Sequence, residues 1–257
     1  MARKRPPSRL WSLAGLALLL VLWEAGHRIW GPLVLPGLAE TGVTLWHMIA
    51  EGRVAPALAQ TAGNAGMGWV LGAATAMIAG TLAGLRPEAQ RALQPVAVVL
   101  LGIPAIAWVV LALLWFGGRW AVVFTVAVAT GPLVFAAAVA GVHSLDGGLV
   151  RMARAFRVPL GARLAHMHLP HMLGHVFPAL ATTLAMSWKV SVMAELLAGA
   201  GGIGDGLATA RAHVDTAAMM AWVLVVVAVL VAVDLALLQP LQRRMVHWRD
   251  DGRGVGT

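Results

Sequence analysis

The chain has 257 residues, of which 60% are hydrophobic and 12% charged, and its formal net charge is +8. Its mean hydropathy of +0.80 excludes a soluble globular protein, whose surface would have to expose large apolar patches. The absence of cysteine excludes disulfides and thiolate metal sites. The composition therefore predicts an integral membrane protein.

Apolar stretches along the chain approach or exceed the roughly 20 residues that a spanning helix needs. They are 10–23, 54–85, 92–118, 120–145, 172–195 and 216–233. The first extends through Glu24 toward His27, and the fifth contains Lys189. The sequence thus predicts an all-α fold with about six transmembrane helices. They form a single domain, residues 10–248, between a basic N-terminus (1–9) and a tail (249–257).

The first stretch also has the basic start and apolar core of a signal peptide. No small-x-small cleavage site follows at residues 23–27, so we expect it to be retained. Lys and Arg residues are concentrated in cytoplasmic segments of membrane proteins. With the N-terminus inside, the external ones are only Arg28, Arg53, Arg119 and Arg211. This pattern predicts that both termini are cytoplasmic, and it accounts for most of the positive charge without a nucleic-acid partner.

Small residues recur at every fourth position of the second expected span. They are Gly68, Gly72, Ala76, Gly80 and Gly84. Such a stripe lets another helix approach closely, so we expect this span to pack inside the bundle. An amphipathic piece at 44–49 lies in the external segment that precedes it.

The longest polar interruption, about 143–170, separates the fourth and fifth spans. Arg151, Arg154 and Arg157 recur every three residues, and an apolar face lies opposite them on the helical wheel. The apolar face consists of Leu149, Met152, Ala153 and Phe156. We expect it to rest on the protein or the bilayer while the arginines face the cytoplasm. Pro159 is expected to end this helix, with a second short helix running from Leu160.

Lys189 and Glu195 fall inside the fifth span, and Asp234 lies toward the inner end of the sixth. Ionisable groups at such depth usually face a pathway or a partner. Structural pairing or snorkelling is the alternative for each. These residues are therefore candidates for a translocation pathway.

The sequence gives little support for nucleotide binding or for a metal site. Neither Lys4 nor Lys189 follows the glycine spacing of a phosphate-binding Walker loop. The G-x-G-x-x-G match at 199–204 has no preceding strand, and a re-entrant or hinge segment is the favoured interpretation. Among the histidines, His171 and His175 have metal-clamp spacing but no local carboxylate or thiolate, so no metal site is expected.

The segment ending at Leu169-Pro170 resembles the cytoplasmic loop of permease subunits in binding-protein-dependent ABC importers, whose pattern is E-A-A-x3-G-x9-I-x-L-P. Ala153 matches its second alanine, and Met167 takes the isoleucine position. The glutamate, first-alanine and glycine positions hold Arg151, Met152 and Arg157. Further similarities to the nitrate, sulfonate and taurine group are Ile103-Pro104, Leu114-Trp115-Phe116-Gly117, the small-residue stripe, and Trp188 followed by Ala194-Glu195.

The resemblance implies a type I ABC importer permease in a bacterial inner membrane, with a coupling helix between helices 4 and 5. Two permease subunits, expected as a homodimer, would form the pathway. A solute-binding protein outside would deliver a small anion such as a sulfonate, taurine or nitrate. The chain is then no enzyme and binds no cofactor, because separate ATPase subunits bind ATP and magnesium. The resemblance implies ATPase coupling through Arg151, Met152, Ala153, Arg154, Arg157, Met167, Leu169 and Pro170. The candidates for the translocation pathway are Lys189, Glu195 and Trp188.

Two alternatives remain open. An ion-coupled secondary transporter would use Lys189, Glu195 and Asp234 as a relay. A diverged membrane scaffold would recruit a partner through its basic loop without a solute pathway.

Overall fold

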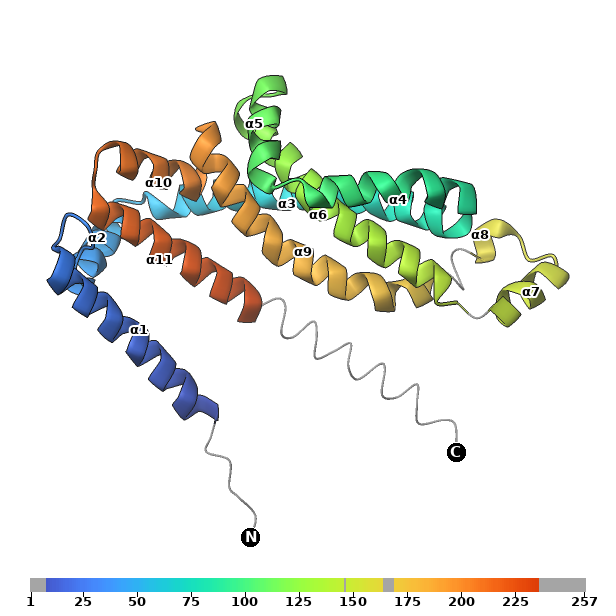
Figure 1. The fold of residues 1–257 in the computed structure, drawn as a ribbon, viewed down its shortest axis with the longest axis horizontal. Helices are drawn as coiled ribbons and strands as arrows, with labels where there is room; N and C mark the ends of the chain where they lie inside the picture. Colours follow the sequence, from blue (N-terminus) through green and yellow to red (C-terminus); the bar gives the residue numbers. More distant parts are fainter. Residues whose placement is uncertain (1–7, 146, 164–168, 236–257) are drawn as a thin grey trace, which may run out of the picture.

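The computed structural model describes residues 8–145, 147–163 and 169–235. Every regular element in these ranges is a helix, which confirms the predicted all-α fold (Figure 1). The helices are α1 (Ser8–Trp30), α2 (Leu38–Ala50), α3 (Val54–Leu85), α4 (Pro87–Gly102), α5 (Ala105–Trp115), α6 (Gly118–His143), α7 (Gly147–Ala155), α8 (Leu160–Arg163), α9 (Leu169–Ala198), α10 (Gly202–Ala212) and α11 (Thr216–Val233).

Within the described residues, α1, α3, α6, α9 and α11 are long and apolar enough to cross a membrane. The third expected span, 92–118, is not one continuous helix. It is divided between α4 and α5, which meet at an angle of 99°. The pair raises the number of spans from 5 to 6 if it is counted as one broken span.

The break between α4 and α5 follows from the sequence Gly102-Ile103-Pro104. Proline has no N–H group and disfavours helical geometry in the residue before it. Ile103 accordingly has an extended backbone, with φ −78° and ψ 126°. Pro104 then becomes the residue that precedes the first turn of α5.

The core of the bundle is formed by α3, α6 and α9. The most extensive packing is between α3 and α6, and α6 also packs along α9. Buried apolar side chains between these helices include Val134, Phe135 and Val176. A second cluster, around Met48, Ile203 and Trp222, joins α2, α10 and α11.

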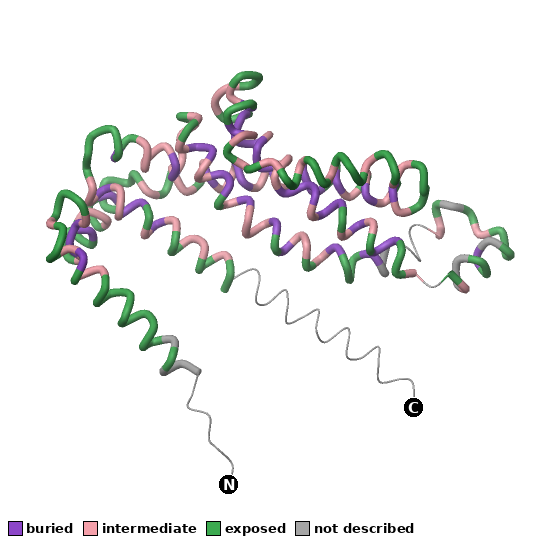
Figure 2. The backbone as a smooth tube through the Cα atoms, viewed as in Figure 1, coloured by how far each residue is buried: buried purple, intermediate pink, exposed green. Residues whose placement is uncertain are grey.

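The helix α1 extends to Trp30, beyond the expected end near His27, and projects away from the bundle (Figure 1). Its side chains are exposed along most of its length (Figure 2). Leu16, Leu19 and Leu22, for example, are 57%, 58% and 63% exposed. An apolar helix without a protein covering suits a lipid environment.

The two ends of the bundle carry different elements. The short helices α7 and α8 lie at one end, between α6 and α9, while α2 and the junction of α10 with α11 lie at the other (Figure 1). The amphipathic piece expected at 44–49 is part of α2, which packs on α11. Candidate coupling residues and the Glu195 region therefore lie at or toward opposite ends of the molecule.

Candidate coupling and pathway sites

The helix α7 carries Arg151, Met152, Ala153 and Arg154 of the predicted coupling segment, and α8 begins at Leu160 as expected. Arg151 is exposed and Ala153 is buried. Of the expected apolar face, Ala153 rests on the protein, while Met152 and Phe156 are 54% and 77% exposed, and the side chain of Leu149 lies outside the described part of the chain. Exposed methionine and aromatic side chains beside arginines are typical of a protein-binding surface.

The remaining coupling candidates are less informative in the structure. Leu169 and Pro170 form the first turn of α9. Met167 lies outside the described residues. Arg157, in contrast, has an unusual backbone conformation.

The turn after α7 occurs at Arg157, so the helix ends before the expected Pro159. Arg157 has φ +52°, in the left-handed region that favours glycine. The N–H of Val158 donates to the carbonyl of Ala153 at 3.0 Å. A left-handed residue followed by this hydrogen bond is the Schellman arrangement that ends many helices. The turn therefore forms although arginine occupies the glycine position of the importer pattern.

Replacing Arg157 with glycine is expected to stabilise this turn by about 1 kcal/mol, because glycine avoids the left-handed penalty. The measurement is the hydrogen-exchange rate of the Val158 amide, which should fall. Arg157→Ala is the matched control, since it removes the same charge but keeps a Cβ atom. Equal exchange in the glycine and alanine variants would contradict the prediction.

The small-residue stripe of α3 faces α6. A Cβ atom at Gly72 would lie 2.6 Å from the carbonyl oxygen of Ala127, and one at Gly80 would lie 2.7 Å from the Cβ of Ala138. Gly68 and Gly84 meet Val126 and Val142 in the same way. Ala76 is buried in the same interface. The two backbones thus approach too closely for larger side chains.

Lys189 lies in the C-terminal third of α9, inside the expected span, and is exposed on the surface of the chain. His175 and Thr182 are also exposed and precede it at intervals of seven residues, which is about two helical turns. Polar side chains therefore follow one exposed face of this spanning helix. Lys189 forms no ion pair with any residue in 8–145, 147–163 or 169–235.

A lysine in mid-span is costly when it faces lipid, so such residues usually face a bundle interior or a water-filled cavity. This face of α9 is therefore unlike residues 13–22 of α1, where the exposed side chains are apolar. Trp188, the neighbouring pathway candidate, is only partly buried. Asp234 directly follows α11, as expected for the inner part of the sixth span.

Glu195 lies elsewhere, in a fully buried polar cluster between α3, α9 and α10. Its Oε2 accepts hydrogen bonds from the hydroxyl of Thr61 at 2.8 Å and the N–H of Gly204 at 3.3 Å. Its Oε1 accepts from the amide of Asn64 at 2.9 Å and the hydroxyl of Ser191 at 3.2 Å. All four of these partners are donors, and Glu195 is 0% exposed. The structure therefore separates Glu195 from the exposed face that carries Lys189.

The glycine-rich segment 199–204 forms the turn between α9 and α10. Gly199, Gly201 and Gly202 all have positive φ angles, and Gly202 has φ +91°. A Cβ atom on Gly202 would lie 2.6 Å from Oε2 of Glu195 and 2.7 Å from the hydroxyl of Thr61. These glycines bring the start of α10 against the polar cluster, so the segment is held in place by its contacts with Glu195 and Thr61.

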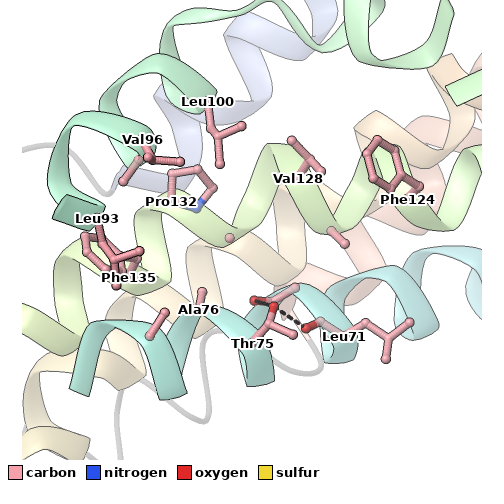
Figure 3. Close-up of a pocket in the computed structure, with 15 residues that line it drawn as sticks. Leu71, Thr75, Ala76, Leu93, Val96, Leu100, Phe124, Val128, Pro132 and Phe135 are labelled. Carbon is pink, nitrogen blue, oxygen red and sulfur yellow. Dashed lines mark hydrogen bonds between the residues drawn. The ribbon is translucent and has the colours of Figure 1, made fainter. Parts of the chain in front are cut away.

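A cavity of about 440 Å³ lies between α3, α4 and α6. Its lining is apolar, with side chains such as Leu71, Val96 and Phe135 (Figure 3). Thr75 supplies the one hydroxyl among these lining residues, and it donates to the carbonyl of Leu71 at 2.8 Å (Figure 3). The cavity offers little to recognise a polar solute, because specific sites need convergent polar groups.

The sequence indicated some members of the polar cluster but not others. Glu195 was singled out by its charge within a span, and Asn64 joins α3 to α9 by donating to it. Thr61 and Ser191 had no assigned role, although Thr61 precedes Asn64 by three residues and Ser191 precedes Glu195 by four. Both spacings place the side chains on one helical face, which was the available signal.

The sequence profile of a family described as "Binding-protein-dependent transport system inner membrane component" matches residues 72–247. The chain belongs to this family. It is thus a multi-pass membrane permease of the ABC importer type, and the family places it within a binding-protein-dependent transport system. The family's permeases form the membrane component rather than a catalytic subunit.

Named relatives support this assignment. The riboflavin transport system permease protein RibX of Chloroflexus aurantiacus is 30% identical, covering 91% of this chain and 88% of its own. The aliphatic sulfonates transport permease SsuC of Bacillus subtilis is 24% identical, covering 98% and 94%. The taurine transport system permease protein TauC of Escherichia coli is 27% identical, covering 67% and 62%.

Solved structures show the same fold. A chain of the inward-facing MetNI methionine ABC transporter aligns with a TM-score of 0.58 and 19% identity, covering 84% of this chain and 96% of that chain. A chain of an amino acid ABC transporter aligns with a TM-score of 0.64 and 15% identity, covering 79% and 98%. The predicted type I importer permease fold is confirmed.

Proposed function

We propose that this permease imports a small anionic solute such as a sulfonate, taurine or nitrate. The observation that carries the proposal is the family membership together with relatives named for sulfonates and taurine. A nitrate import permease, NrtB of Synechococcus elongatus, is 26% identical over 54% of this chain. The exposed Lys189 of α9 provides a positive charge suited to an anion.

The proposed assembly contains two copies of this chain, two ATPase subunits and an external solute-binding protein in a bacterial inner membrane. Both chain termini and α7 are on the cytoplasmic side, in keeping with the distribution of arginine. ATP and magnesium bind to the ATPase subunits, and this chain binds no cofactor. Met152, Phe156 and Arg151 are exposed on or beside α7, so they form the contact through which ATP-driven closure moves the spans.

The proposed pathway follows the α9 face that contains Lys189, with Trp188 beside it. Glu195 is assigned to the pathway wall rather than to direct solute contact, because its carboxylate is buried and fully hydrogen-bonded. Charge-selective passage along this face requires that water reaches it from at least one side of the membrane.

Transport in proteoliposomes tests the proposed function. The purified permease would be reconstituted with its cognate ATPase and binding protein, and uptake of a panel of sulfonates, taurine, nitrate and neutral solutes measured. ATP-dependent uptake of the anions is expected. Uptake that persists without ATP would instead support the ion-coupled transporter, and no uptake of any solute would support the scaffold.

Cysteine accessibility provides a separate prediction for the pathway, since the chain has no cysteine of its own. Thr182→Cys is expected to react with thiosulfonate reagents in membranes, and faster with an anionic than a cationic one. Thr182 and Lys189 are two turns apart, about 10 Å along the axis. At that distance the charge of Lys189 changes the ratio of the anionic-reagent rate to the cationic-reagent rate by about fourfold, even at the dielectric constant of water.

Two further variants make this measurement specific. Adding Lys189→Met to Thr182→Cys should abolish the preference for the anionic reagent while leaving the cysteine reactive. Val227→Cys, at an exposed apolar position of α11, is the lipid-facing control and should react slowly with both reagents. Equal reactivity of Thr182→Cys and Val227→Cys would show that this face of α9 does not line the pathway.

A further inference from the structure

The start of α10 is held by side chains from two other helices. Gly201 precedes α10 and provides no side-chain cap. The first N–H groups of any helix lack partners within the helix and need acceptors from elsewhere. Here the N–H of Ile203 donates to the hydroxyl of Thr61 at 2.9 Å, and the N–H of Gly204 donates to Glu195. The acceptors therefore belong to α3 and α9.

The hydroxyl of Thr61 takes part in two hydrogen bonds, one with Ile203 of α10 and one with Glu195 of α9. It accepts the hydrogen bond from Ile203 and donates its own hydrogen to Glu195, so α10, α3 and α9 meet at one oxygen atom. Thr61, Glu195 and Ile203 are each 0% exposed. The side-chain oxygen of Asn64 in the neighbouring cluster is buried without a hydrogen-bond partner, whereas Thr61 and Glu195 are paired, and paired buried polar groups make a local structure rigid and specific.

The negative charge of Glu195 is also favourable beside the N-terminus of α10. A carboxylate is stabilised near the N-terminus of a helix by the helix dipole and by the free N–H groups. Glycine at 202 and 204 is needed for this approach, because a Cβ atom at Gly204 would overlap the carbonyl oxygen of Val192 and one at Gly202 would meet Glu195. The glycine-rich segment 199–204 and Glu195 thus form one structural unit.

We propose that Glu195 is a positioning residue which, with Thr61, caps α10 from outside and locks the α9–α10 turn onto α3. The locked unit lies away from the coupling helix α7, toward the opposite end of the bundle (Figure 1). It makes α10 move with α3 and the C-terminal part of α9 as one body. The statement about movement rests on the proposed function, whereas the lock itself does not.

Hydrogen exchange of the full-length chain in nanodiscs tests the lock. In Thr61→Val, the amides of Ile203 and Gly204 are expected to exchange about tenfold faster, which corresponds to the loss of one buried hydrogen bond. Thr61→Ser keeps the hydroxyl and should restore protection. Thr125→Val is the matched control, because Thr125 is equally buried but its hydroxyl donates only to Ala121 of its own helix.

Unchanged exchange of these amides in Thr61→Val would overturn the proposal. So would an increase spread evenly over α6 and α9, which indicates general destabilisation. If Thr61→Val does not fold, Glu195→Gln serves instead, since an amide has one acceptor oxygen in place of two.

In the reconstituted transporter, Thr61→Val should lower the solute imported per ATP more than Thr125→Val does. If the wild type shows no ATP-driven uptake, the proposed function fails while the exchange result still decides the lock.

Discussion

Replacing Gly72 with alanine is expected to destabilise the bundle, although alanine is the better helix former by about 1 kcal/mol. The new methyl group would lie 2.6 Å from the backbone oxygen of Ala127 and 2.8 Å from its Cα atom. These neighbours belong to the backbone of α6, so the two helices would have to move apart. Overpacking of this kind typically costs about 1–3 kcal/mol. The expected net effect is a loss of stability.

The matched control for Gly72 is Gly66 on the same helix. A Cβ atom at Gly66 would meet nothing within 4 Å, so Gly66→Ala should be neutral or stabilising. The free energy of unfolding in mixed micelles would be compared for the two variants. Equal stability of the two would show that the distance between α3 and α6 does not limit the residue at position 72.

The packing role of α3 could be predicted because a four-residue repeat of small side chains has a direct geometric meaning. Pro104 indicates a possible break between α4 and α5, but the sequence does not predict the angle between the two helices. A proline within an apolar stretch can produce a mild kink or a complete break. Which of them occurs depends on how the two parts pack on neighbouring helices.

The polar cluster could be predicted only in part. Glu195 was conspicuous because of its charge in an apolar span, and that charge favoured a pathway position. Two of its partners come from α3, more than 130 residues away in the sequence, and another is the backbone N–H group of Gly204 in α10. Backbone donors carry no sequence signal, so the difference between a pathway carboxylate and a buried helix cap became visible only in three dimensions.

The second large effect is expected at the coupling helix. The double variant Arg151→Glu/Arg157→Gly should bind the cognate ATPase at least about tenfold more weakly if the ATPase presents an acidic groove. Arg151 and Arg157 are both exposed, and both replace residues that are uncharged or acidic in the importer pattern. Their charges therefore have no evident role within this chain. The measurement is the affinity for the ATPase and its stimulated activity at two salt concentrations.

Two controls separate charge from shape in this experiment. Arg157→Gly alone improves the turn and removes one charge, so it should weaken binding less than the double variant. Arg211→Glu reverses an exposed charge in the last turn of α10, at the end of the bundle away from α7, and should leave ATPase binding unchanged. Electrostatic contacts weaken as salt is added, so the wild-type affinity should fall with salt more steeply than that of the double variant. Unchanged binding and ATPase stimulation in the double variant would exclude an acidic groove and leave Met152 and Phe156 as the contact.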